Sequence, residues 1–595
     1  MAALTRITGM LMLCTTLPAS AVVAEYVEQA PAGAAGNVIE LGLAVPEPVT
    51  SSVPIAGFRS YASLMAGLDL LALEHAYVRR HRLGQSLEGE AIYAWQFGDN
   101  TNAPVMLQSG GIHAREWASP EAVSGILENL VAAAEDGGVV SWLRDNANIL
   151  LVPVLNPDGF LTTQRAPRTT RIDEDPQNSP SDPLYPRDGR MRRKNLRNSD
   201  GQLQSADDTL QGVDLNRNLG PYWNSGRGSS RTPSSIVYNG ASVESEPETQ
   251  ALLAAGALLG ADTLRLYIDT HSFGRVFFYN NTGNSRLFQI SQDLVNLIRQ
   301  VPARAYAEDA VSPGLGIGAS DEYFSYTLNV PAYTLELEPG TSQLAEYGGN
   351  PGVSHSGFIL PESEITRVRE EVYQMALLAY YHQMGPTIVR EVRLTQTDGE
   401  MIYRHSWQDQ NTTTRTLQTA PNTALQGGQH YTLNLIFNKP MRWVDAQGQA
   451  VNYPAQNVSL HPNLSLFSSR SEELPAGQWS KTRYAADTYS VDFTLPTDMS
   501  SPVNLHIAVR DMAGRALDSD PASVTRWQDG HWLGFENENG QSGDVGGEDH
   551  NTLLQIAGAP SATPAPASTG GSGAPSLLFL ITLSALARRA RHGIA

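Results

Sequence analysis

The stretch APVMLQSGGIHAREWASPEA, residues 103–122, joins a short apolar run to a histidine and a glutamate three positions apart. The run has the length and composition of a buried strand, so His113 and Glu116 follow the point where that strand ends. Imidazole nitrogens and carboxylate oxygens are common zinc ligands, and a catalytic zinc ion takes three protein ligands and keeps one position open for water. The spacing alone is weak evidence, because a histidine near a strand end is often only structural. The other residues of such a site must come from elsewhere in the chain.

Strand-like and helix-like segments alternate on both sides of this stretch. Short apolar runs typical of buried strands recur at residues 91–98, 148–156, 264–272 and 332–339. Apolar residues at helical spacing lie between them, over residues 61–81, 119–136, 246–261 and 363–384. We therefore predict an α/β domain in which helices flank a mixed β-sheet.

The character of the sequence changes after Gly385. Alternating runs such as HYTLNLIFN (430–438) and TYSVDFTLP (488–496), separated by turn residues, predict a small β-sandwich. An acidic, Gly-rich stretch and a Pro/Ala/Ser/Gly-rich stretch follow, both typical of linkers. The predicted division is a signal peptide (1–21), a leader segment (22–57), the α/β domain (58–385), a β-sandwich accessory domain (386–540), a linker (541–573) and a hydrophobic C-terminal tail (574–595).

Both ends of the chain carry features of an exported protein. Arg6, an apolar run and the small residues ASA at positions 19–21 predict a secretory signal peptide, with an uncleaved anchor as the alternative. The single cysteine, Cys14, lies inside this segment, so we expect no disulfide in the mature chain.

The C-terminal segment STGGSGAPSLLFLITLSALARRARHGIA, residues 568–595, combines a Gly/Ser motif, an apolar run and arginines. It resembles the GlyGly sorting tail of exported proteins of Gram-negative bacteria, and a plain membrane anchor is the alternative. We expect an extracellular or cell-surface protein, with export machinery and a tail-processing protease as partners. Membrane association through the tail is then either transient or anchored.

The net charge of the chain excludes one class of partner. The sequence contains 41 Lys and Arg residues against 61 Asp and Glu residues, a formal net charge of −20. Such a balance repels polyanions, so we expect no nucleic-acid binding.

Two polar residues at the ends of distant apolar runs complete a possible hydrolytic site. His271, in YIDTHSFG, lies where a strand becomes polar and is the candidate for a third zinc ligand. Glu336, in AYTLELEPG, lies near the end of another buried strand, on the same side as Glu338. A carboxylate near a zinc-bound water can take its proton. The alternative for either glutamate is a salt bridge at the strand end.

Two further motifs have the chemistry to hold a free carboxylate. GVDLNRN contains Asp214, Asn216 and Arg217, and RMRRKN contains Arg190 and Arg193 in a long polar loop. A guanidinium group can donate to both oxygens of a carboxylate, and an amide adds another donor. The alternatives are a solvated basic run and a turn capped by an aspartate.

These motifs, in this order, resemble the zinc metallocarboxypeptidases, the funnelin family of digestive and regulatory enzymes. The likeness runs from about Tyr61 to Gly385. It is carried by GQSLEGEAIY, GGIHAREWASPEA, LNPDGF, RMRRKN, GVDLNRN, IDTHS, SDEYFSY, YTLELEP and GFILPESEI. Several ordered motifs are far more specific than one, so the α/β domain is identified as a member of this family.

The resemblance implies the chemical roles of five residues. It makes His113, Glu116 and His271 the ligands of one Zn²⁺ ion per chain, and Glu336 the general base or acid. Arg193 matches the arginine that polarises the scissile carbonyl and stabilises its oxyanion.

The resemblance also implies how substrate and metal are positioned. Asn216 and Arg217 match the pair that binds the terminal carboxylate of the substrate, and Arg115 and Arg190 match arginines of the substrate subsites. Asp214 matches an aspartate that accepts the second ring N–H of the first histidine and so orients it on the metal.

Two features match the family less closely: the pocket for the side chain of the substrate, and a tyrosine on a mobile loop before it. Asp321 falls where the basic-residue-specific branch of the family carries an aspartate, which favours C-terminal Lys or Arg, whereas a gap would place Glu322 there instead. The family usually carries a tyrosine on a mobile loop before this pocket, and the ungapped position here is Gly314. Another residue such as Tyr306 replaces it, or the enzyme works without it.

The sequence therefore predicts an exported zinc metallocarboxypeptidase that hydrolyses C-terminal amino acids from peptides and proteins with a free C-terminus, using zinc-activated water. One alternative is a zinc amidase of the same fold that acts on cell-wall peptides or acylated amino acids. The other is a non-catalytic binding protein that kept the fold. The pair Asn216 and Arg217 favours the carboxypeptidase.

Overall fold

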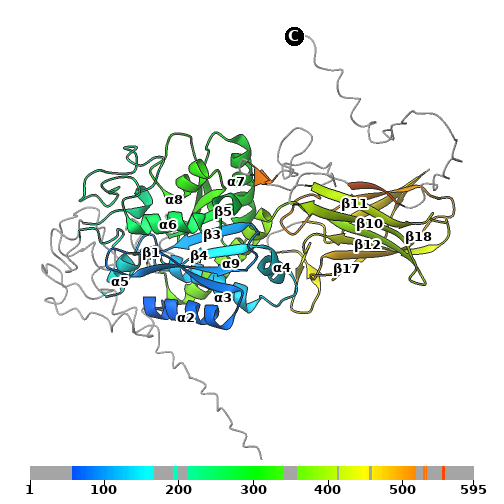
Figure 1. Cartoon of the computed structure of the whole chain (residues 1–595), viewed down its shortest axis with the longest axis horizontal. Helices are drawn as coiled ribbons and strands as arrows, with labels where there is room; N and C mark the ends of the chain where they lie inside the picture. Colours follow the sequence, from blue (N-terminus) through cyan, green and yellow to red (C-terminus); the bar gives the residue numbers. More distant parts are fainter. Residues whose placement is uncertain are drawn as a thin grey trace, which may run out of the picture.

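The computed structural model describes residues 57–165, 192–198, 211–340, 358, 360–411, 414–453, 458–468, 470–517, 527–528, 531–532 and 552–556. These residues form an α/β domain and a second domain made of β-strands (Figure 1). The predicted signal peptide and C-terminal tail lie outside the described residues, as does Arg190.

The α/β domain is built on a mixed sheet, which in the described residues has eight strands in the order β1-β2-β4-β3-β5-β8-β6-β7. Their bounds are β1 (Val78–Gln85), β2 (Ala91–Phe97), β3 (Val105–Gly110), β4 (Asn148–Val152), β5 (Leu264–Ser272), β6 (Val276–Asn280), β7 (Ala307–Val311) and β8 (Ala332–Leu337). The central strands β4, β3, β5 and β8 are parallel, whereas β2 and β6 flank them antiparallel. This arrangement confirms the predicted fold class. Because parallel strands end at one edge, it brings the carboxyl ends of β3, β5 and β8 together.

Helices cover both faces of this sheet. Strand alternation divides the apolar side chains between two cores, with Met106 and Ile149 in one and their neighbours Leu107 and Leu150 in the other. The first core is covered by α2 (Tyr61–Glu74), α3 (Ala118–Ala132), α4 (Val139–Asn146), α5 (Pro157–Arg165), α7 (Ser285–Ile298) and α9 (Glu362–Gln383). The second is covered by α6 (Pro247–Ala257) and η3 (Tyr323–Thr327), and the short turns η1 (Leu215–Arg217), η2 (Ala261–Thr263) and α8 (Ser320–Glu322) complete the domain. Among the described residues, no helix combines the length and apolar character that a bilayer crossing requires.

One predicted helix is too long. Residues 61–81 were expected to be helical, but α2 ends at Glu74 and β1 begins at Val78. Strand β1 pairs with β2, and the guanidinium carbon of Arg80 lies 4.6 Å from the ring centroid of Tyr93. Pairing with a neighbouring strand and side-chain packing on it therefore override the helical spacing of the apolar residues.

The second domain consists of two main sheets in the described part of the chain. One has the order β11-β10-β9-β12-β18-β17 and the other the order β16-β15-β19-β22. Both contribute to one hydrophobic core, for example through Val392 and Leu433 from the first sheet and Leu464 and Leu505 from the second. The strands are β9 (Val389–Gln396), β10 (Met401–Asn411), β11 (Thr414–Asn422), β12 (His430–Phe437), β13 (Trp443–Val444), β14 (Ala450–Val451), β15 (Asn463–Phe467), β16 (Ser471–Glu473), β17 (Gln478–Ser480), β18 (Thr488–Thr494), β19 (Val503–Ala508), β20 (Trp527–Gln528), β21 (His531–Trp532) and β22 (Thr552–Ile556).

The sheets of the second domain include a strand beyond residue 540. Strand β22 lies inside the segment predicted as a linker, and it pairs antiparallel with β19, with Ile556 opposite Val503. The short apolar run TLLQI is surrounded by acidic, Gly-rich and Pro-rich sequence, so composition hides a strand that only the sheet partner stabilises.

The two domains share buried contacts. Tyr453, Tyr484 and Met512 of the β-domain belong to the core that α3 and α9 line. At the end of α9, Arg515 Nη1 donates to His382 O at 2.6 Å. Lys439 Nζ donates to Gly385 O and pairs with Asp511 at 2.7 Å, and both charged side chains are almost fully buried. The interface is therefore packed and hydrogen-bonded rather than a loose tether.

Candidate zinc and catalytic site

The turn after β3 positions the first two predicted zinc ligands. Gly111 has a φ of +64°, and a Cβ added there would lie 3.1 Å from Pro153 O. Only glycine suits this conformation and this close approach of two backbones. The turn places His113 and Glu116 just before α3, at the edge where β5 delivers His271.

His113, Glu116 and His271 converge at this edge. Glu116 contacts the Nδ1 atoms of both histidines, at 2.8 Å from His113 and 3.0 Å from His271. One ligand atom from each residue lies within 4.8 Å of the other two, and all three side chains are buried. Two imidazole nitrogens and one carboxylate form the donor set of a hydrolytic zinc site, so these residues fit the predicted ion.

Each histidine has a carboxylate behind it. His113 Nε2 lies 3.1 Å from Asp214 Oδ1, the contact predicted for Asp214, and His271 Nε2 lies 2.9 Å from Asp269 Oδ2. Such partners leave Nδ1 free to bind the metal and fix the ring orientation. The role of Asp269 was missed from the sequence, although its spacing of two from His271 on one strand places both side chains on the same face.

We expect Asp269→Asn to weaken zinc binding by roughly 10–100-fold, the usual cost of losing such a partner. The Asp269 carboxylate contacts His271 and accepts hydrogen bonds from Ser320 Oγ at 2.6 Å and Ser109 Oγ at 2.8 Å. An asparagine amide would place its own N–H groups against these donors. Competition with a chelator of known affinity measures the change. Asp309→Asn, on the exposed part of β7, is the matched control. Equal zinc affinity in the parent and Asp269→Asn would contradict this role.

Glu336 lies beside the metal ligands. It is paired directly with His271 in the parallel register of β5 and β8. Its Oε2 atom is buried and meets no hydrogen-bond partner among the described residues. Burial raises the pKa of Glu336 to about 7, and the nearby Glu116 carboxylate adds to the rise while the His271 ring opposes it. A carboxylate poised near neutral pH beside the zinc ligands has the position and acidity of a general base.

Arg193 borders the same site. Its Nε donates to Asp214 Oδ2 at 2.9 Å, and its Nη1 lies 3.2 Å from His113 Nδ1. Burial alone would raise the pKa of Asp214, but the Arg193 and Arg217 guanidinium groups and the His113 contact hold it well below its usual range. The ionised Asp214 thus fixes both a metal ligand and a cation directed at the metal site.

The predicted carboxylate-binding pair lies next to these groups. Asn216 Nδ2 is 3.4 Å from His271 Nε2, and its Oδ1 accepts from Ser320 N at 2.8 Å. Arg217 Nε donates to Gly228 O at 2.6 Å. The guanidinium group of Arg115 lies 4.2 Å from the ring centroid of Phe358. The described structure therefore places Asn216 at the zinc site and holds Arg217, its neighbour in sequence, through the Gly228 carbonyl.

Asp321 and Glu322 have different surroundings. Asn280 Nδ2 donates to Asp321 Oδ2 at 2.8 Å, and Thr334 Oγ1 donates to Asp321 Oδ1 at 3.1 Å. Glu322 instead accepts three backbone N–H groups, from Ile317, Gly318 and Ala319. Because Glu322 caps its own turn, the contacts favour Asp321 as the pocket carboxylate.

At the loop position where the family carries a tyrosine, this chain has Gly314, and Tyr306 is buried elsewhere. Gly314 has a φ of +78°, and a Cβ there would meet no atom within 4 Å. Tyr306 is 1% exposed, and its ring packs against Phe277 with centroids 5.9 Å apart. Tyr306, the residue suggested as a replacement for that tyrosine, therefore lies in the hydrophobic core. The ring of Tyr222 packs against Gly316 of this loop.

The chain is similar in sequence to several known proteins. The carboxypeptidase B of Helicoverpa zea is 28% identical over 46% of this chain and 58% of its own length. The metallocarboxypeptidase A of Trichophyton rubrum is 25% identical over 56% of this chain and 75% of its own length. The crystal structure of the carboxypeptidase A from Helicoverpa armigera aligns with a TM-score of 0.43 at 24% identity, covering 55% of this chain and 74% of that chain.

A family match covers the domain that holds the site. Residues 65–375, just over half of the 595 residues, match the family described as Zinc carboxypeptidase. This segment includes the three metal-ligating side chains, Glu336 and Asp321. The chain therefore belongs to the zinc carboxypeptidase family.

Proposed function

We propose that this protein is a zinc metallocarboxypeptidase that removes C-terminal residues from peptides and proteins with a free C-terminus. The observation that carries the proposal is the buried convergence of His113, Glu116 and His271 beside Glu336. When bound, zinc acts as a Lewis acid that polarises the scissile carbonyl and acidifies water.

The residues of the chain perform the remaining tasks. Asn216 and Arg217 bind the terminal carboxylate of the substrate, which sets the scissile bond at the metal ligands. Glu336 takes a proton from the attacking water and returns it to the leaving amine. Arg193 donates to the oxygen on which negative charge develops.

The two alternative functions have less support. A zinc amidase that needs no free α-carboxylate has no use for the pair Asn216 and Arg217. A binding protein that kept the fold has no use for Glu336, whose buried carboxylate oxygen lacks a partner among the described residues and is costly to retain.

We also propose a preference for C-terminal Lys or Arg. The Asp321 carboxylate is buried, and an ionised carboxylate there would bind an ammonium or guanidinium group. Burial and the neighbouring Glu322 raise the pKa of Asp321 to about 7, against the hydrogen bonds from Thr334 and Asn280. The pocket is therefore mostly neutral below this pH and anionic above it.

We expect release of free Arg and Leu from peptides that differ only in that last residue, and none from the C-terminal amides. The ratio of kcat/KM for Arg over Leu should rise between about pH 6 and pH 8, because the free enzyme ionises Asp321 over this range. The titration of Glu336 affects both substrates and cancels in the ratio. Asp321→Asn should lower the ratio at least about tenfold at the higher pH and remove its pH dependence.

The possible failures are distinguishable. If the zinc-loaded protein cleaves none of the free-acid peptides, the carboxypeptidase proposal is wrong. If it trims Arg and Leu equally at every pH, only the pocket assignment is wrong. Equal cleavage of acid and amide would instead support the amidase.

Export is proposed from the sequence alone. The N-terminal segment and the C-terminal tail support a secreted or cell-surface protein, and both lie outside the described residues. Fractionation of the producing cells, with N-terminal and C-terminal sequencing of the mature protein, would test both processing sites.

A further inference from the structure

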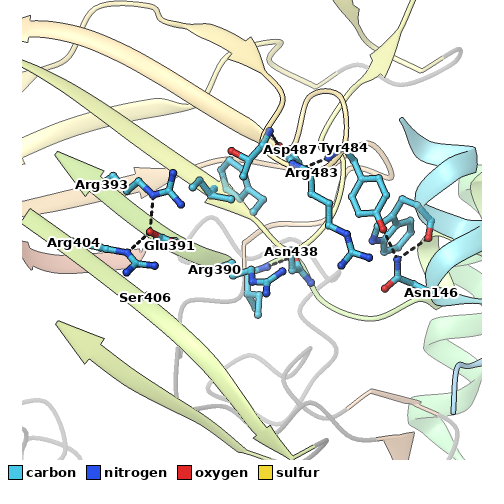
Figure 2. Close-up of a pocket in the computed structure, with 15 residues that line it drawn as sticks. Asn146, Arg390, Glu391, Arg393, Arg404, Ser406, Asn438, Arg483, Tyr484 and Asp487 are labelled. Carbon is cyan, nitrogen blue, oxygen red and sulfur yellow. Dashed lines mark hydrogen bonds and ion pairs between the residues drawn. The ribbon is translucent and has the colours of Figure 1, made fainter. Parts of the chain in front are cut away.

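A large pocket lies between the two domains and shares no residue with the zinc site. It has a volume of about 720 Å³ and is walled by α4 on one side and by β9, β10, β12 and the 482–487 loop on the other. Trp142 and Asn146 come from the α/β domain, and the remaining lining residues come from the β-domain (Figure 2). We call it the seam pocket. Its size suits a small molecule, and domain interfaces are common places for such sites.

Four arginines line the seam pocket in the described part of the chain: Arg390, Arg393, Arg404 and Arg483. They face only two lining carboxylates, Glu391 and Asp487. Cationic side chains therefore exceed anionic ones, in a protein whose net charge is −20. Such an excess of cationic side chains around a pocket gives it a locally positive potential.

Glu391 fixes two of these arginines side by side. Arg393 Nε and Arg404 Nε both donate to Glu391 Oε1 at 2.6 Å, from the adjacent strands β9 and β10 (Figure 2). Arg404 is directly opposite Arg393 in the antiparallel register. Among the described residues, the hydrogen bonds of these two guanidinium groups are the Nε donations to Glu391. One carboxylate therefore orients two guanidinium groups and leaves their outer donors available to a ligand.

A β-bulge places Arg390 in the pocket. Ile436 pairs with Glu391 and Phe437 pairs with Val389, so Arg390 is the additional residue of β9. Bulges redirect a side chain relative to the regular alternation. The Arg390 side chain is exposed, and no ion pair joins it to another described residue.

Arg483 comes from a rigid loop. The Asp487 carboxylate accepts the backbone N–H groups of Thr482, Arg483 and Tyr484 at 2.7–2.8 Å, so it is occupied within the loop. Tyr484 Oη donates to Asp145 at 2.7 Å, which ties the loop to α4. The Arg483 side chain is 59% exposed, and the carboxylate nearest to it is Asp145 at 3.8 Å.

We propose that the seam pocket binds a small polyanion with two or more phosphate or carboxylate groups. The oriented pair Arg393 and Arg404 holds one group in a bidentate manner, and Arg390 and Arg483 hold another. Because α4 and the β-domain both wall the pocket, the bound ligand stabilises the interface between the domains.

The test uses the full zinc-loaded protein with pyrophosphate and tricarballylate as probes. Isothermal calorimetry and thermal unfolding are run at an ionic strength balanced with NaCl, and the zinc content is measured after each titration. The double variant Arg393→Gln/Arg404→Gln should bind at least about tenfold more weakly, the cost of losing charged hydrogen bonds. Arg390→Gln should weaken binding without touching a native contact. Arg470→Gln, an exposed arginine paired with Glu472 outside the pocket, should bind like the parent.

Each outcome decides the proposal. Binding of pyrophosphate alone would show that the pocket selects phosphate groups, and binding of tricarballylate alone would show that it selects carboxylates. Binding of both probes would support a site for either kind of anionic group. Anions that bind only at the zinc site would titrate equally in the parent and the arginine variants. Equal affinity in these proteins, or no binding of either probe, overturns the proposal.

Discussion

Glu336→Gln is expected to lower kcat by roughly 10²–10⁴-fold while zinc remains bound at one ion per chain. Glutamine keeps the shape of the side chain but cannot accept a proton from water. Burial raises the pKa of Glu336 to about 7, so its charged form is disfavoured in the folded protein. The pKa of Glu336 is higher in the folded protein than in the unfolded chain. The folded parent therefore loses stability as the pH rises between these two pKa values. The variant should therefore unfold at the same temperature as the parent or higher.

Glu338, two residues further along, is the matched control. Its buried carboxylate pairs with Arg304 and Arg367, each at 2.9 Å. Glu338→Gln should lower the unfolding temperature and leave kcat nearly unchanged, because the neighbouring guanidinium groups lose a charged acceptor. Measurement of kcat, zinc content and unfolding temperature for both variants separates the two roles. If Glu336→Gln kept parental kcat, Glu336 would not be the base.

His271→Gln is expected to abolish peptide hydrolysis by removing a metal ligand. The loss of zinc affinity should exceed the roughly 10–100-fold expected for a residue that only orients a ligand. Glutamine keeps a polar group facing Asp269, so the buried carboxylate is not left without a donor. Metal content after dialysis and activity at increasing zinc concentrations measure the effect.

His81→Ala provides the control for this variant. His81 contacts Gln96 at 2.8 Å on the β1–β2 pair, apart from the metal ligands, and its loss should preserve zinc and activity. Full zinc occupancy in dialysed His271→Gln would show that the ion binds elsewhere.

The central strands and their functional residues could be predicted because each carries its own signal. Strands β3, β5 and β8 are buried on both faces, so their sequences are continuous apolar runs that end abruptly in polar residues. The polar residues at those ends include His113, His271 and Glu336. For Glu336 and Glu338 the sequence could not separate a catalytic carboxylate from a salt bridge. Only the positions of Arg304 and Arg367 assign the salt bridge to Glu338.

Other features depend on partners distant in the sequence. β1 has an Arg-rich sequence of which only Val78 is buried, and it becomes a strand through pairing with β2. β22 depends on β19 in the same way. In the sequence, Asp269 is one residue of a buried strand. The structure adds that Ser109 and Ser320 donate to its carboxylate. For Asp269, the local sequence offers only the spacing of two from His271.

The buried ionic contacts at the end of α9 bear on how the protein can be dissected. Lys439 donates to Gly385 O, Thr387 donates to Asp511, and Arg515 donates to His382 O, all in buried surroundings. A gene truncated after Gly385 would encode an enzyme half that exposes the apolar end of its last helix. We therefore expect the enzyme half to be less stable alone than in the whole protein, because the β-domain covers part of its core.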